Sequence, residues 1–222
     1  KFYRMDFSNL KECADCVKTI CNEHKIGFIV NNAGILSPPE FVRTSDGNEY
    51  TFQVNFLAHL LIDEIIIRTN GGQHPLRIVS VSSMVHKLAK SDMDYCRNKE
   101  CYSPIKAYSD SKYFLALMAK YFASRYDAYN LLCFSLDPGI FGSSIYRMHK
   151  GWFRFLYRIA APFMRSPANA AKVLGDILTG QAPVNGALYN IRKKIRTPGE
   201  IDSGAGAAFW EECRSLISPF LD

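Results

Sequence analysis

The chain has 222 residues, of which 48% are hydrophobic and 22% are charged, so it can bury a sizeable core. This composition excludes a disordered, collagen-like or low-complexity chain. The formal net charge is +6, and the excess is local: the residues between Asp137 and Asp176 include six Lys or Arg and no acidic residue, while the remainder balances. One basic patch of this kind argues against a nucleic-acid-binding surface.

Seven cysteines are scattered along the chain, an odd number that favours a reducing compartment over a disulfide framework. Cys13 and Cys16 form a C-x-x-C pair, but no second pair completes a zinc site, so we expect no metal. The most apolar segment, 57–67, contains Asp63 and Glu64 and falls short of the roughly 18 residues of a membrane span. The chain begins with Lys rather than Met and shows no signal peptide, so we expect an N-terminal piece to lie outside it.

Strand-like and helix-like segments alternate along the chain. In order they are a strand at 1–5, a helix at 10–21, a strand at 28–30, a helix at 46–68, a strand at 77–83, a helix at 108–126, a strand at 130–136, a helix at 167–178 and a strand at 187–191. Ser8 and Ser166 are the expected N-caps of the first and last helices. Short apolar strands separated by long helices predict one α/β domain over 1–222, with a parallel sheet covered on both faces.

Small or polar residues follow three of these strands, at 31–34, at 82–83 and at 137–139. In open α/β sheets, ligands bind beyond the carboxyl ends of the strands. Each cluster alone could be ordinary turn chemistry, whereas three together favour a cofactor cleft.

Tyr108 and Lys112 are four residues apart on a predicted helix, so they share one face. A nearby ammonium favours the phenolate, and a tyrosine with a lowered pKa can exchange a proton with an alcohol or carbonyl. Four other Tyr-x-x-x-Lys pairs occur in the chain, but only this one lies in a long amphipathic helix that follows a strand ending in serines.

These motifs resemble the short-chain dehydrogenase/reductases in kind and in order. They are Asn31-Asn32-Ala33-Gly34, Asn55 in VNFLAHLL, Ser83 at the end of RIVSVSS, Tyr108-Ser-Asp-Ser-Lys112, and Pro138-Gly139. Thr44-Ser45-Asp46-Gly47, the Ser82–His86 stretch and the 186–216 tail are similar to the retinol dehydrogenase branch, which includes the WW-domain oxidoreductase relatives. The resemblance covers nearly the whole chain and implies a Rossmann-like doubly wound sheet.

The resemblance implies four catalytic residues. Tyr108 would exchange the proton, and Lys112 would lower the pKa of Tyr108 and bind the nicotinamide ribose. Ser83, with Ser82 ranked second, would hold the substrate oxygen. Asn55 would anchor a water that links Lys112 to solvent, although a polar residue bonding a loop from a helix face is the alternative.

The resemblance also implies NADP or NAD as cofactor, with NADP favoured. The expected contacts are Asp6, Asn32, Ala33 and Gly34 on the adenosine side, and Tyr108, Lys112, Pro138, Gly139, Ile140 and Ser143 on the nicotinamide side. Asp6 could equally be an acidic neighbour of the first helix.

Two features depart from the family pattern. The glycine-rich turn T-G-x-x-x-G-x-G is not in the sequence, so we expect the first βαβ unit to lie outside this chain. Its loss would split the sheet, expose unpaired edges, and weaken dinucleotide binding and stability. Asp137 stands where relatives of this branch tend to carry histidine, which is a departure at the nicotinamide-side loop.

The basic, aromatic segment at about 141–166 lies where the family places its substrate lid. It is either a lid helix packing its own apolar face or a cationic flap over a lipophilic substrate, with peripheral membrane contact through 147–165.

The main hypothesis is an NAD(P)-dependent oxidoreductase that acts on a retinoid, steroid or lipid aldehyde. The alternative is a non-catalytic fragment that mediates membrane or protein contact. We expect an intracellular location, in the cytoplasm or at the cytosolic face of a membrane such as the endoplasmic reticulum. A homodimer through the helices that carry Asn55 and Tyr108 is a further hypothesis.

Overall fold

A computed structural model describes residues 1–89, 93–139, 167–179, 183–190, 192, 195–196 and 206–221. Its strands form one sheet in the order β1-β2-β3-β4-β5. Their bounds are β1 Phe28–Asn31, β2 Leu76–Val81, β3 Leu131–Asp137, β4 Leu188–Asn190 and β5 Ile195–Arg196. The first four strands are parallel and β5 is antiparallel to β4, so the predicted α/β Rossmann-like fold is confirmed.

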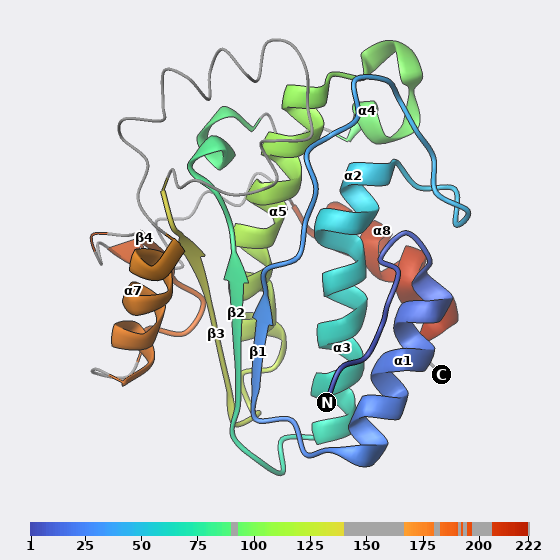
Figure 1. Cartoon of the computed structure of the whole chain (residues 1–222). Helices are drawn as coiled ribbons and strands as arrows, with labels where there is room; N and C mark the ends of the chain where they lie inside the picture. Colours follow the sequence, from blue (N-terminus) through green and yellow to red (C-terminus); the bar gives the residue numbers. More distant parts are fainter. Residues whose placement is uncertain are drawn as a thin grey trace.

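Helices connect the parallel strands and lie on both sides of the sheet (Figure 1). They are α1 Leu10–Glu23, α2 Tyr50–Phe52, a π-helical turn Gln53–Leu57 that runs into α3 Ala58–Asn70, α4 Asp94–Arg97, α5 Pro104–Arg125, α7 Pro167–Thr179 and α8 Ala207–Ile217. Short 3₁₀ turns span Met84–Leu88, Lys99–Cys101 and Ser218–Phe220.

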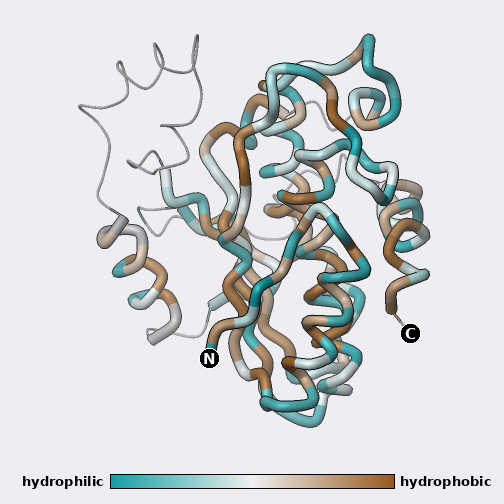
Figure 2. Tube along the Cα trace, turned by 45° about the vertical axis from the view of Figure 1, so that its right-hand side comes forward, coloured by the Kyte–Doolittle hydropathy of each residue, from teal (hydrophilic) through white to brown (hydrophobic). Residues whose placement is uncertain are grey.

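Alternation along each strand separates the core into two layers. Ile78 and Cys133 point to the layer that contains α1, α3, α5 and α8, whereas their neighbours Val79 and Phe134 point to the layer that contains α7. This follows from the two-residue period of a strand. In Figure 2 the hydrophobic residues concentrate in the strands and in the helices packed on them, while the outer loops are largely hydrophilic.

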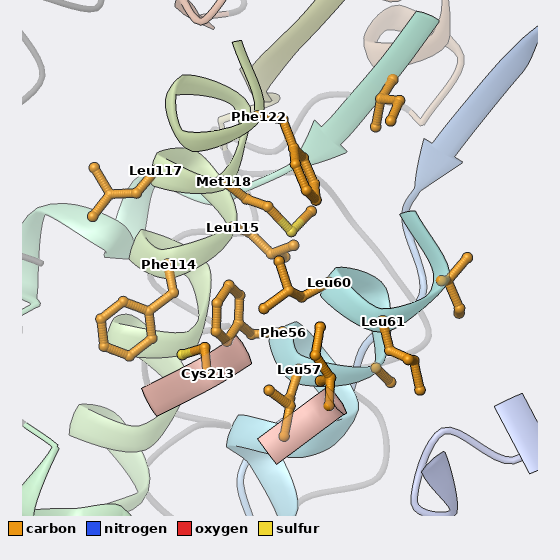
Figure 3. Close-up of a cluster of buried hydrophobic side chains, with 14 of the residues drawn as sticks. Phe56, Leu57, Leu60, Leu61, Phe114, Leu115, Leu117, Met118, Phe122 and Cys213 are labelled. Carbon is orange, nitrogen blue, oxygen red and sulfur yellow. The ribbon is translucent and has the colours of Figure 1, made fainter. Parts of the chain in front are cut away.

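The larger layer is built on aromatic packing between α3, α5 and α8. Phe209 of α8 lies with its ring centroid 4.4 Å from that of Phe114 and 5.8 Å from that of Phe56. The next residue, Trp210, stacks on Tyr121 of α5 at 4.1 Å. Figure 3 shows Phe56 and Phe114 converging with leucines of both helices beside Cys213 of α8. The C-terminal helix therefore packs both on the π-helical turn that precedes α3 and on α5.

Strand β1 is the edge strand of the described sheet. Phe28 and Val30, on the face opposite α1 and α3, are 41% and 42% exposed. The expected exposed edge therefore agrees with the structure, whereas the expected split of the sheet is wrong for the described residues, because β1 pairs directly with β2 and the strands form one sheet. The predicted strand at 1–5 is wrong, because these residues pair with no described strand, and an extended segment without a ladder is not a strand.

Several boundaries differ from the sequence expectations for local reasons. Asn9 rather than Ser8 caps α1, since its side chain accepts a hydrogen bond from the Glu12 amide. The second helix begins at Tyr50, after Glu49 caps it through two amides, rather than at 46. The Tyr108 helix begins four residues earlier, at Pro104, because proline is favoured in the first turn. Strand β5 and helix α8 were not predicted.

The segment Tyr50–Asn70 is long and apolar enough to cross a membrane by length and composition alone. Nearly all of it is buried inside the fold, as in the core helix of a folded domain. Its two acidic side chains, Asp63 and Glu64, are also buried, and each accepts a hydrogen bond, from Asn31 and Arg68 respectively.

Candidate active site

The three polar clusters predicted from sequence lie at one end of the sheet. Asn31 pairs with Ser80 and Val81 pairs with Leu136, so β1, β2 and β3 present their carboxyl ends side by side. A bond from the Ser82 amide to the Leu136 carbonyl continues this register by one residue. The loops at 31–34, 82–83 and 137–139 therefore share one edge, where ligands bind in open α/β sheets.

Lys112 lies on α5 directly behind this edge. Its side chain is 6% exposed, and its ammonium donates a hydrogen bond to the Val81 carbonyl at 3.3 Å. Burial lowers the pKa of Lys112 to about 8, because desolvation penalises the charged form. The buried Ser82 hydroxyl donates to the Lys112 carbonyl at 2.7 Å and so fixes this turn of α5 against the end of β2.

Asn55 lies at the centre of the π-helical turn and is fully buried. Its Oδ1 accepts the Ile35 amide at 2.8 Å, while its Nδ2 donates to the Ile35 carbonyl at 2.9 Å and to the Ser111 hydroxyl at 3.1 Å. The loop-bonding role left open by the sequence is therefore present. A role in anchoring water stays a prediction, although π-helical turns are frequent at functional sites.

Gly34 lies between these two side chains. A Cβ at this position would stand 3.1 Å from Asn55 Oδ1 and 3.3 Å from Lys112 Nζ. The Asn55-held loop therefore passes within contact of the buried ammonium, and only a glycine allows that approach without displacing a neighbour.

Tyr108 and Ser83 complete the predicted catalytic set. Tyr108 is half-buried on α5, one turn before Lys112. Ser83 is half-buried and precedes the 3₁₀ turn, and its carbonyl lies 2.6 Å from His86 Nδ1. Since the Ser82 hydroxyl is buried and already bonded, this placement favours Ser83 over Ser82 as the serine available to a substrate.

On the adenosine side, Asn32 and Ala33 are exposed just beyond β1. Asp6 is also exposed, and its Oδ1 accepts both the amide and the hydroxyl of Ser8, which lowers the pKa of Asp6. This local turn before α1 is the alternative that the sequence left open for Asp6. An adenine contact stays a prediction.

On the nicotinamide side, Pro138 is buried and Gly139 has φ +74°. The Gly139 amide donates to Asp137 Oδ1 at 2.9 Å, which forms an Asx turn. The residue that departs from the family pattern therefore stabilises the turn that follows β3. Ile140, Ser143 and the predicted lid at 141–166 lie outside the described residues.

The sequence assigned no functional role to His59, which lies one helical turn after Asn55. Its Nε2 lies 2.9 Å from the Ala33 carbonyl, and its ring is 2% exposed. The i, i+4 spacing from Asn55 was the available signal, because it places both residues on one face.

The C-x-x-C pair lies in α1, away from this edge. Cys13 is buried, and burial raises its pKa to about 12, which keeps it a thiol. Within the described ranges no group of His, Cys, Asp or Glu is arranged to hold a metal ion.

The residues present fit one end of a dinucleotide. At the strand ends the buried Lys112 ammonium, beside the loop that Asn55 holds, is a hydrogen-bond donor of the kind that suits a ribose hydroxyl. The donors that would bind the pyrophosphate are not among these residues, because the glycine-rich turn that would supply them is not in the sequence.

A family model for short chain dehydrogenases matches residues 1–151. Retinol dehydrogenase 12 of Mus musculus is 28% identical over 170 residues, which are 76% of this chain and 53% of the relative. Polyprenol dehydrogenase of Homo sapiens is 33% identical over 191 residues, covering 83% and 52%. Retinol dehydrogenase 14 of Homo sapiens is 31% identical over 225 residues, covering 96% and 65%. The chain thus spans about half to two-thirds of the length of these relatives.

Solved structures share the fold at lower identity. A short chain dehydrogenase from Burkholderia cenocepacia in complex with NADP superposes with a TM-score of 0.57 at 15% identity, covering 97% of this chain and 80% of that one. A 4-hydroxyisoleucine dehydrogenase mutant complexed with NADH and succinate gives 0.63 at 16% identity, covering 86% and 76%. Together with the strand-end motifs, the family match establishes that this chain belongs to the short-chain dehydrogenase family, in the retinol dehydrogenase branch.

Proposed function

We propose that this chain carries the catalytic residues of an NAD(P)-dependent oxidoreductase that interconverts an alcohol and a carbonyl. The observation that carries the proposal is the buried ammonium of Lys112, held between the end of β2 and the Asn55-bound loop at Gly34. Burying a lysine is costly, and strongly perturbed groups at a strand-end cleft are typical of functional sites. The family match supports the same reaction class.

In this proposal each residue has a separate task. Tyr108 gives its phenolic proton to a carbonyl oxygen or takes one from an alcohol, while the Lys112 ammonium stabilises the phenolate. Ser83 donates a hydrogen bond to the reacting oxygen, and Asn55 holds the loop against which the cofactor ribose lies. When bound, the nicotinamide supplies or accepts the hydride.

We propose a lipophilic alcohol or carbonyl compound as substrate, such as a retinoid, a steroid or a lipid aldehyde. The names of the relatives, retinol dehydrogenase and polyprenol dehydrogenase, support this class, since both alcohols are long and apolar. An intracellular location, with cytosolic-face membrane contact through 147–165, belongs to the same proposal. We also propose NADP rather than NAD as the cofactor.

The test is Tyr108→Phe in the longest native form of the protein, with a panel of lipophilic aldehydes and alcohols. We expect turnover to be lost while NADPH or NADH binding persists. Tyr121→Phe on the same helix is the control, because its buried hydroxyl has no hydrogen-bond partner among the described residues. Wild-type turnover in Tyr108→Phe would refute the proposal.

A second candidate is a non-catalytic module that binds a protein or a membrane. The open edge at β1, with Phe28 and Val30 exposed, favours it because such an edge can receive a partner. It predicts no saturable change in NADPH or NADH fluorescence, and binding to anionic vesicles or to a protein. Saturable cofactor binding by the native protein would reject it.

A further inference from the structure

We propose that His59 is a positioning residue that fixes the turn at Ala33 and Gly34 by donating its Nε2–H to the Ala33 carbonyl. The two atoms are 2.9 Å apart, and the imidazole is buried on α3. Burial lowers the pKa of His59 to about 4, and the nearby charge of Lys112 acts in the same direction. The ring is therefore neutral near pH 7, and the bond to a carbonyl requires the tautomer that carries its proton on Nε2.

His59 acts beside Asn55, one helical turn away on the same face. Asn55 binds both the amide and the carbonyl of Ile35, and His59 binds the carbonyl of Ala33. The two side chains thus hold the loop on either side of Gly34, the residue that approaches Lys112 Nζ. Neither contact alone fixes the position of Gly34, because a loop held at one point can pivot about it.

The same helix also ties down the N-terminal segment. The imidazole of His59 meets the ring of Phe7 edge to face, with centroids 5.0 Å apart, and Gln53 Nε2 donates to the Phe7 carbonyl at 3.3 Å. Side chains of the π-helical turn and of α3 together therefore set the position of the segment next to Asp6 relative to the loop at Ala33. The consequence for a dinucleotide rests on the proposed function, in which both segments lie on the adenosine side.

The test compares His59→Leu, which removes the donor, with His59→Gln, whose amide nitrogen can occupy the place of Nε2. In the longest native form, hydrogen exchange at the Ile35 amide reports the loop without assuming any activity. We expect His59→Leu to speed this exchange about fivefold or more, the worth of one net hydrogen bond. His59→Gln should restore the protection. His74→Leu, in the turn between α3 and β2, is the control and should leave it unchanged.

Steady-state kinetics give the second measurement. We expect the cofactor KM of His59→Leu to rise by a similar factor with little change in kcat, because His59 acts through the Ala33 loop, whereas the proposed function places Tyr108 and Ser83 at the reacting atoms. Altered exchange in a protein that shows no turnover or cofactor binding would leave the positioning role standing and refute the proposed function instead.

Unchanged exchange at Ile35 in His59→Leu, or failure of His59→Gln to restore it, would overturn the inference. If His59→Leu does not fold, His59→Gln is compared directly with the wild type. If the Ile35 amide of His59→Gln exchanges as slowly as that of the wild type, the inference is supported. If it exchanges faster, the inference is overturned.

Discussion

Replacing Gly34 with alanine tests whether the loop and the buried ammonium are as tightly packed as the structure shows. The added methyl would lie 3.1 Å from Asn55 Oδ1 and 3.3 Å from Lys112 Nζ, closer than nine in ten real Cβ contacts. One neighbour must therefore move by a few tenths of an ångström. Asn55 is fixed by three hydrogen bonds, whereas Lys112 has a single 3.3 Å bond to Val81 in the described part of the chain, so we expect Lys112 to move.

We expect Gly34→Ala to cause at most a moderate loss of stability together with a loss of catalytic efficiency. Overpacking costs about 1–3 kcal/mol, and alanine returns about 0.4–1 kcal/mol by restricting the unfolded chain, which leaves about 0–2.6 kcal/mol of destabilisation. A 1 Å misplacement costs about 100-fold in rate, so a shift of a few tenths should lower kcat/KM about fourfold to tenfold.

The assays are urea unfolding by circular dichroism and steady-state kinetics on the same preparations. Gly175→Ala in α7 is the matched control, because no atom of the described residues lies within 4 Å of the position that its Cβ would take, and it should stabilise the protein by about 0.5–1 kcal/mol. A Gly34→Ala protein with wild-type kcat/KM and a stability gain like that of Gly175→Ala would show that the contact at Lys112 does not exist.

Three further predictions concern the core, the buried lysine and the C-terminal helix. Phe209→Ala should cost about 3–5 kcal/mol in urea unfolding, since the ring packs on Phe56 and Phe114; a loss below about 1 kcal/mol would mean that α8 is not docked as shown. Lys112→Met should raise Tm at pH 7. The lysine pKa falls from 10.5 unfolded to about 8 folded, so the unfolded state binds more protons between these values and wild-type stability rises with pH across that window. The advantage of Lys112→Met should therefore shrink from about pH 8 to pH 10.5, and an advantage independent of pH would contradict the assignment. Because Phe209 and Trp210 of α8 already pack on Phe56 and on Tyr121 of α5, a cysteine cross-link between the α5 helices of two copies should not form through that face, and its formation would contradict this packing.

The sequence predicted correctly those elements whose position depends mainly on the residues within the element itself. The apolar runs that became β1, β2 and β3 were placed within about a residue or two, because a buried parallel strand is a short apolar segment in any context. The spacing of Tyr108 and Lys112 correctly put both on one helix. Helix starts were less accurate, since Asn9 and Pro104 set them through a cap and a first-turn preference that neighbouring residues could equally have supplied.

Long-range contacts could not be predicted in the same way. The segment at 1–5 has a strand-like pattern, yet it pairs with no described strand, because a ladder depends on a neighbour and not on the segment itself. The packing of α8 gave no local signal, since its aromatic residue Phe209 packs on Phe114 and Phe56, which lie roughly 95 and 150 residues earlier in the chain.

The sequence by itself determined the family, the mainly parallel character of the sheet and the identity of the residues at the carboxyl ends of its strands, because motifs and hydrophobic periods are local properties of the chain. Only the tertiary structure decided what those residues do to one another. It buried Lys112 against a carbonyl, bound Asn55 to both polar groups of Ile35 and brought His59 to the Ala33 carbonyl. It also separated Ser82 from Ser83 by burying one hydroxyl. Burial and hydrogen-bond partners come from segments distant in sequence, and these two quantities set the charge, the tautomer and the position of each group at the site.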